Sequence, residues 1–328
     1  ARKDPVARFE HFLEDRGVLD RDALATIRAE YKERIDSLVE EALSAPEPRS
    51  SVEEKMADVF APSLLVPREP EAELQGAAPE TRYVDAISDG LRTAMRRDER
   101  IVLLGQDIAE YGGVFKVTEG FVEEFGKDRV RNTPIIESGA IGAALGLALG
   151  GYVPMVEMQF GDFITCGFNQ IVNNLAKTHF RWNERIPVVL RVPVGGGVGA
   201  GPFHSQNVES WFTSVAGLKV VAPANPYDAK GLLIAAFEDG NPVLYLEHKA
   251  LYRSARGHVP DGHYSLPLGR ARVAREGGDA TVVTYGAGVG WALAAAEAFA
   301  GDGRQIEVLD LRSLMPWDVE AVVSSVRK

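Results

Sequence analysis

The stretch SGAIGAALGLALGGYVPMVEM, residues 138–158, decides the fold, because a helix of small residues runs directly into a short apolar strand. The same unit recurs along the chain. Further helices are predicted at 84–94, 163–180 and 227–238, and further strands at 101–104, 188–192, 219–222 and 243–247. Alternation of this kind is typical of a mostly parallel sheet with helices on both faces. The sequence therefore predicts an α/β fold.

The flanking regions differ in composition. Residues 1–60 are predicted to be helical, with Asp20 placed to cap a long helix and a Ser51–Glu54 capping box before a short helix reaching Val59. Residues 61–80 contain four prolines and are typical of an extended, semi-rigid linker. Beyond a boundary near 255–268, strands at 281–285 and 306–311 and helices at 291–299 and 317–328 predict a smaller α/β unit.

Charge and composition exclude some classes of partner. The net charge is −11, from 47 acidic and 36 basic residues, which disfavours nucleic acid. The longest apolar stretch, 141–158, contains four glycines, Pro154 and Glu157, so no membrane span is expected. Cys166 is the single cysteine, which fits a reducing, cytoplasmic location. The chain begins without methionine and stops within a predicted helix, so both ends are expected to be cuts in a longer polypeptide.

Three motifs invite a functional interpretation. The glycine-rich loop 195–201 fits a relaxed dinucleotide-binding pattern, but Pro202 interrupts the helix that should follow, which favours a mobile loop close to a ligand. Glu137 opens the small-residue helix, and spacing alone slightly favours an ordinary acid at a helix start over a reactive carboxylate. His204 follows the loop, where an exposed histidine and a proton donor in a cleft are equally supported.

Six stretches carry a family resemblance in the same order and spacing. They are GQDIAEYGGVF (105–115), GKDRVRNTPIIE (126–137), EMQFGDF (157–163), FHSQ (203–206), LKVVAPANP (218–226) and DLRSLMPWD (310–318). Through them residues 81–328 resemble the beta subunit of thiamine-diphosphate-dependent 2-oxoacid dehydrogenases of the branched-chain or pyruvate type. The resemblance implies a transketolase-like pyrimidine-binding domain at 81–260 and a partial transketolase C-terminal-like domain at 268–328. Residues 1–60 resemble the last helices of an alpha subunit, which implies a fused polypeptide.

The resemblance assigns roles to particular residues. Glu137 falls on the position that hydrogen-bonds the pyrimidine ring nitrogen of the cofactor and activates it, and His204 on the position that assists acyl transfer. Ile135, Gln159 and Phe163 fall on positions that line the pyrimidine pocket. Phe163 departs from the tyrosine that is frequent in the branched-chain type, so a hydroxyl contact is missing.

Metals and partners are also implied. The Mg²⁺ ligands are expected in an alpha-type region outside this chain, because the Gly-Asp-Gly motif that would hold the metal has Phe163 in place of its last glycine, and Asn173 and Asn174 are expected to be helix residues. Asp239 and Asn241 match a loop for a monovalent cation such as K⁺. Implied partners are the alpha-type region, a second protomer in a dimer of alpha–beta units, the lipoyl-bearing dihydrolipoyl acyltransferase and a 2-oxoacid.

The function that follows is oxidative decarboxylation of a 2-oxoacid with acyl transfer to lipoyl-lysine. The segment 159–163 slightly favours a branched-chain 2-oxoacid over pyruvate. Two alternatives stay open: another transketolase-like thiamine enzyme, such as a transketolase or an acetoin-cleaving relative, and a non-catalytic module that docks on an acyltransferase.

Overall fold

A computed structural model describes residues 4–70 and 78–328. The chain divides into two compact units, Ala1–Glu54 and Lys55–Lys328. The first contains helices α1 (Pro5–Asp15) and α2 (Arg21–Ser44), and neither has a buried residue. As predicted, Asp20 caps α2, because its side chain accepts a hydrogen bond from the Ala23 amide at 2.7 Å. Because no residue of α2 is buried, most of its apolar side chains are exposed and form no core within this unit.

The second unit begins near helix α3 (Val52–Ala57), which ends two residues before the predicted limit at Val59. The predicted capping box is present: the Ser51 amide donates to Glu54 Oε2 at 2.8 Å, and the Glu54 amide donates to Ser51 Oγ at 3.1 Å. Residues 61–70 contain no helix, as expected of the linker, and Arg68 forms an antiparallel bridge with Ser265. The rest of the predicted linker, 71–77, lies outside the described residues.

The main sheet has seven strands within the described part of the chain, in the order β12-β6-β7-β5-β4-β2-β3. Their bounds are β2 (Ile101–Gly105), β3 (Val130–Asn132), β4 (Val153–Glu157), β5 (Val189–Val194), β6 (Lys219–Val221), β7 (Val243–His248) and β12 (Ser313–Met315). All neighbours are parallel except β12, which runs antiparallel to β6. β12 was not predicted, and it comes from the region assigned to the C-terminal domain.

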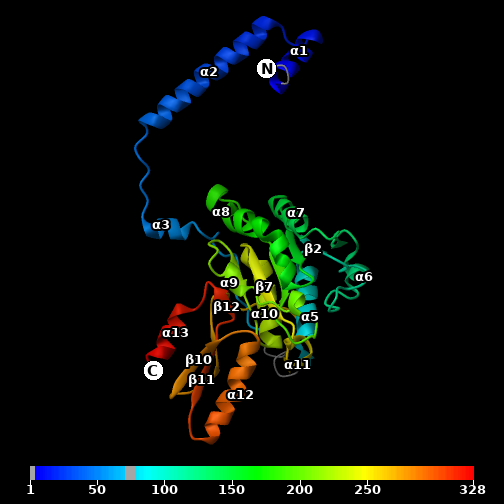
Figure 1. Ribbon diagram of the computed structural model, residues 1–328, viewed down its shortest axis with the longest axis vertical. Helices are drawn as coiled ribbons and strands as arrows, with labels where there is room; N and C mark the ends of the chain where they lie inside the picture. The colour runs from blue at the N-terminus through cyan, green and yellow to red at the C-terminus, as the bar shows by residue number, and fades with distance from the viewer. Residues whose placement is uncertain (1–3, 71–77) are drawn as a thin grey trace. The chain divides into compact units, whose positions relative to one another are not determined.

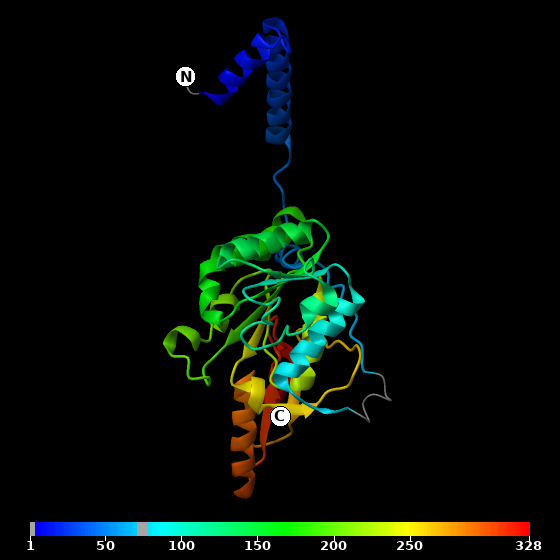
Figure 2. The ribbon, with the colours of Figure 1, turned by 90° about the vertical axis from the view of Figure 1, so that its right-hand side faces the viewer.

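Helices cover both faces of this sheet, which confirms the predicted architecture. Helices α5 (Tyr83–Arg97) and α10 (Pro226–Asp239) pack together on one face (Figure 2). Helix α7 (Glu137–Leu149) and the segments that follow β4 cover the other. Alternate strand residues enter the two cores: Ile101 and Leu103 join the first, and Val102 and Leu104 join the second.

The predicted helix 163–180 has three parts. They are a 3₁₀ segment η1 (Gly161–Gly167), a π-helical turn η2 (Gln170–Leu175) and an α-helix α8 (Ala176–Trp182). The 3₁₀ segment packs closely against α7 at its end, where a Cβ on Gly167 would lie 2.4 Å from Ile141 Cδ1. Asn173 and Asn174 lie in the π-helical turn, which confirms them as helix residues.

The C-terminal part contains a smaller sheet in the order β10-β11-β9. The central strand β11 (Ile306–Asp310) runs parallel to β10 (Ala280–Thr284) and antiparallel to β9 (Arg272–Arg275). Helix α12 (Ala287–Gly301) packs on this sheet (Figure 1), and α13 (Val319–Val326) starts two residues later than predicted. The remaining elements are β1 (Glu80–Arg82), β8 (Arg256–His258), α6 (Phe121–Phe125), α9 (Glu209–Phe212), α11 (Leu251–Ser254) and η3 (Pro202–His204). None of the helices in 4–70 and 78–328 is long and apolar enough to cross a membrane.

Candidate functional site

The predicted site residues lie on loops that follow the carboxyl ends of strands in the main sheet. Glu137 and Ile135 follow β3, Gln159 and Phe163 follow β4, and His204 follows β5. Loops at this edge of a parallel sheet are the usual ligand-binding positions of open α/β folds.

Glu137 is the first residue of α7 and is half-buried. Its Oε1 accepts a hydrogen bond at 3.1 Å from Nε2 of Gln106, the residue that follows β2. No hydrogen bond or ion pair to Oε2 is found among the described residues. One carboxylate oxygen is thus held in place, while the other is free for a ligand. Gln106 lies in one of the motifs that carry the family resemblance, although its role was not predicted.

The surface beside Glu137 is apolar and uncovered. Ile135 is 84% exposed and Ile136 is 52% exposed. Exposed apolar side chains next to a half-buried carboxylate are typical of a surface that a ligand or a partner covers.

Phe163 and His204 are brought together by a third ring that the sequence did not single out. The ring centroid of Phe160 lies 4.5 Å from that of His204 and 6.1 Å from that of Phe163, and Phe163 lies 5.5 Å from His204. All three pairs meet edge to face, which is a favourable geometry for aromatic rings. Gln159 is half-buried directly before Phe160 on the same loop.

The glycine-rich loop is shaped by close backbone approach. Gly195 has φ of 77°, and a Cβ there would lie 2.2 Å from His248 Nε2. The loop is followed by the three-residue segment η3 and not by the long helix that a dinucleotide site requires.

Two ionisable residues beneath the loop were missed as site residues. Asp162 is 7% exposed; its Oδ1 accepts a hydrogen bond from the Gln206 amide at 3.3 Å, and its Oδ2 is buried without a hydrogen-bond partner among the described residues. Lys249 is 2% exposed and donates to the Pro193 carbonyl at 3.4 Å. Burial lowers the pKa of Lys249 to about 8, although nearby Asp162 opposes that shift. In the sequence, Asp162 belongs only to the incomplete Gly-Asp-Gly motif, and Lys249 lies in no recognised motif.

A buried ionic network supports these loops. The Arg191 guanidinium in β5 contacts Glu157 Oε2 at 2.5 Å and Glu247 Oε1 at 2.6 Å, and the Tyr252 hydroxyl donates to Glu247 Oε2 at 2.6 Å. Burial raises the pKa of Glu157, while the Arg191 charge opposes this. Such a network joins β4, β5 and β7 just below the site. Removing one partner would leave an uncompensated buried charge.

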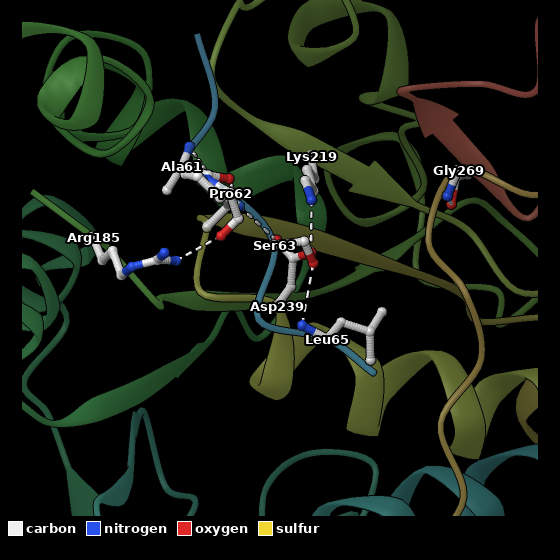
Figure 3. Close-up of polar contacts among 10 residues, drawn as sticks. Ala61, Pro62, Ser63, Leu65, Arg185, Lys219, Asp239 and Gly269 are labelled. Atoms are coloured by element: carbon white, nitrogen blue, oxygen red, sulfur yellow. Dashed lines mark hydrogen bonds and ion pairs between the residues drawn. The ribbon is translucent and has the colours of Figure 1, made fainter. Parts of the chain in front are cut away.

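The residues predicted to hold a monovalent cation lie at a different place. Asp239 ends α10, Asn241 follows it, and both are buried. Asp239 Oδ2 accepts hydrogen bonds from Lys219 Nζ at 2.7 Å and Ser63 Oγ at 2.5 Å, and Figure 3 shows these side chains together. An ammonium group therefore already contacts the Asp239 carboxylate. In the described part of the chain, no cluster of three or more His, Cys, Asp or Glu is placed to hold a metal.

Comparison with known proteins identifies the family. Residues 80–255 match transketolase, pyrimidine binding domain, and residues 269–328 match transketolase, C-terminal domain. The 2-oxoisovalerate dehydrogenase subunit beta of Bacillus subtilis is 48% identical over 248 residues, which are 75% of this chain and 76% of the relative. The chain belongs to the family of 2-oxoacid dehydrogenase beta subunits.

Other members of this family and a related fold are also similar to the chain. The pyruvate dehydrogenase E1 component subunit beta of Staphylococcus epidermidis is 46% identical over 247 residues, or 75% of this chain and 76% of that protein. A solved structure, "Split gene transketolase, inactive beta4 tetramer", has a TM-score of 0.61 at 26% identity and covers 74% of each chain. The predicted family and fold class are confirmed, while the two beta subunits differ in the 2-oxoacid that their names give.

Proposed function

We propose that this beta-type chain supplies the pyrimidine-binding half of an enzyme that decarboxylates a 2-oxoacid with thiamine diphosphate. The observation that carries the proposal is the Glu137 carboxylate, with Oε1 held by Gln106 and Oε2 free beside the exposed Ile135. In a chain of this family, that arrangement fits an aminopyrimidine, which needs one hydrogen-bonding carboxylate and apolar contacts to its ring.

The chain's own residues would divide the chemistry between them. Thiamine diphosphate, when bound, supplies the electron sink for decarboxylation. Glu137 would share a proton with the pyrimidine ring nitrogen through Oε2, while Gln106 fixes the carboxylate orientation. Phe163, Gln159 and Ile135 would line the ring pocket. His204, held against Phe160 and Phe163, would move a proton during acyl transfer to lipoyl-lysine.

The remaining partners follow from the same proposal. An alpha-type region would hold the diphosphate and Mg²⁺, and two alpha–beta units would form the active dimer. The exposed apolar side chains of α2, including Tyr31 and Ile35, support a fused alpha-type region that covers them. We place branched-chain 2-oxoacids before pyruvate as substrates, in line with the 48% identity to the 2-oxoisovalerate enzyme. A cytoplasmic location rests on the single cysteine.

Glu137→Gln tests the catalytic assignment. Glutamine keeps the shape but cannot share the proton, so the full-length protein should lose CO₂ release from 2-oxoisovalerate by about 100-fold or more. Glu123→Gln is the matched control, because Glu123 also lies in the first turn of a helix and is exposed. An unchanged rate in Glu137→Gln would refute the assignment and favour a non-catalytic docking module.

Acyl transfer separates the proposal from another transketolase-like thiamine enzyme. A 2-oxoacid dehydrogenase component should release CO₂ from a 2-oxoacid and transfer the acyl group to lipoamide, whereas a transketolase or an acetoin-cleaving relative breaks a carbon–carbon bond of a ketose or of acetoin and releases no CO₂. Absence of both CO₂ release and lipoamide acylation, measured on 2-oxoisovalerate, pyruvate and 2-oxoglutarate, would favour the alternative.

A further inference from the structure

The segment 61–68, here called the strap, is bound to the buried Asp239–Asn241 turn. The Ala61 amide donates to Asn241 Oδ1 at 2.8 Å, and Asn241 Nδ2 donates back to the Ala61 carbonyl at 3.0 Å. The Leu64 amide donates to the Asp239 carbonyl at 2.9 Å. The strap precedes residues 80–255, which match the pyrimidine-binding family. The strap therefore lies outside the matched domain, while the turn that it contacts lies within it.

The polar atoms of the turn are already engaged. Asp239 Oδ1 accepts from Asn241 Nδ2 at 2.8 Å, and Asp239 Oδ2 accepts from Lys219 Nζ and Ser63 Oγ. K⁺ is bound by several oxygen atoms that replace its hydration shell. At this turn, Asp239 Oδ2, the Asp239 carbonyl and the Asn241 amide oxygen face donors of the strap or Lys219, and Asp239 Oδ1 faces the Asn241 amide of the turn itself.

The charges also disfavour an added cation. The Lys219 ammonium balances the charge of the Asp239 carboxylate, and a second positively charged side chain, Arg185, lies close by. The Arg185 guanidinium donates to the Pro62 carbonyl at 2.6 Å, and a Cβ on Gly240 would lie 3.2 Å from Arg185 Nη1. Figure 3 shows Arg185 and Lys219 around the same stretch of the strap. A monovalent cation would meet two positive side chains and one carboxylate that is already paired.

We propose that the Lys219 ammonium and the strap take the place of a monovalent cation at the Asp239–Asn241 turn, so the fold needs no K⁺ there. The strap then acts as a structural part of the domain, because its amides and hydroxyl complete the hydrogen bonding of a buried acidic turn. This inference concerns stability and is independent of the catalytic roles of Glu137 and His204.

The unfolding temperature of the full-length protein in different salts tests the proposal. It should change by less than about 1 °C between KCl and tetramethylammonium chloride at equal ionic strength, because no K⁺ ion bound to the folded state would raise it. The tetramethylammonium ion is too large for such a site. A rise of several degrees in KCl would overturn the proposal without any variant being needed.

Lys219→Ala should create the cation dependence that the native chain lacks. Leaving Asp239 buried without its counter-charge should lower the unfolding temperature by roughly 6–15 °C in tetramethylammonium chloride. KCl should restore part of the loss. Lys230→Ala is the matched control: its ammonium is also buried and contacts Asp89 at 2.5 Å, but the Asp89 side chain is 44% exposed and can be hydrated. Absence of K⁺ rescue in Lys219→Ala, or equal rescue in both variants, would contradict the proposal.

Discussion

At the scale of single residues, the site depends on how each polar atom is held. Glu137 keeps one oxygen on Gln106 and presents the other, so its orientation is set by a residue of the loop that follows β2. Among the described residues, His204 has no comparable polar side-chain partner, and its ring packs against those of Phe160 and Phe163. The two residues should therefore respond differently to substitution.

His204→Ala should separate the two half-reactions. Decarboxylation should stay within about threefold of the native rate, because Glu137 is untouched, while acylation of lipoamide should fall by about 100-fold or more through loss of the proton donor. Single-turnover CO₂ release and lipoamide acylation measure the two steps. His11→Ala, at an exposed helix position, is the control. An equal loss of both steps would contradict the acyl-transfer role.

At the scale of elements, an ionic cluster joins the C-terminal part to the main domain. Arg312 Nη2 contacts Asp228 Oδ1 at 2.6 Å near the start of α10, and Arg272 of β9 lies 3.4 Å from Asp228 and 3.7 Å from Asp310 at the end of β11. Burial, with the nearby Asp228 charge, raises the pKa of Asp310 from 3.8 to about 6. The Asp310 carboxylate is therefore ionised at neutral pH, which lowers the stability of the folded protein.

The sign of the pH dependence follows from this raised pKa. Between about pH 6 and 4, folded Asp310 binds a proton that the unfolded chain does not, so its destabilising effect is present above pH 6 and disappears as the pH falls. Asp310→Asn should therefore stabilise the protein above pH 6 by about 1–3 kcal/mol, with a gain that shrinks toward pH 4.

Urea unfolding from pH 4 to 8 measures this difference. Asp302→Asn, at an exposed position, is the control and should show no such trend. A gain for Asp310→Asn that grows as the pH falls would contradict the raised pKa.

At the scale of the whole molecule, the proposed cofactor site is half of a site. Ile135 and Ile136 are exposed, and no metal-binding cluster exists within residues 4–70 and 78–328. Residues 1–328 alone should bind thiamine diphosphate with Mg²⁺ on the order of 100-fold more weakly than the same residues combined with the proposed alpha-type region, because tight pockets enclose most of the ligand surface. Isothermal titration of both proteins measures this ratio. Equal affinity would show that no alpha-type region is needed.

The sequence by itself determined the local elements and the family. Alternating apolar segments predicted β2, β4, β5, β6 and β7 of the main sheet but not the short strand β3, and Asp20 and Ser51 marked helix starts that the structure confirms. These features depend on neighbours within a few positions, so they can be recognised along the chain. The motif around Glu137 likewise pointed to one family, which the comparisons confirm.

The tertiary structure alone decided the contacts between distant segments. β12 joins the main sheet from the C-terminal part, Gln106 orients Glu137, and Ala61 binds Asn241 across 180 positions. No local pattern marks such pairs, because the free energy of burying an amide or an ammonium depends on whichever group the fold brings beside it. For the same reason, Asp239 and Asn241 suggested a cation site in the sequence, while the folded chain places Lys219 and the strap there.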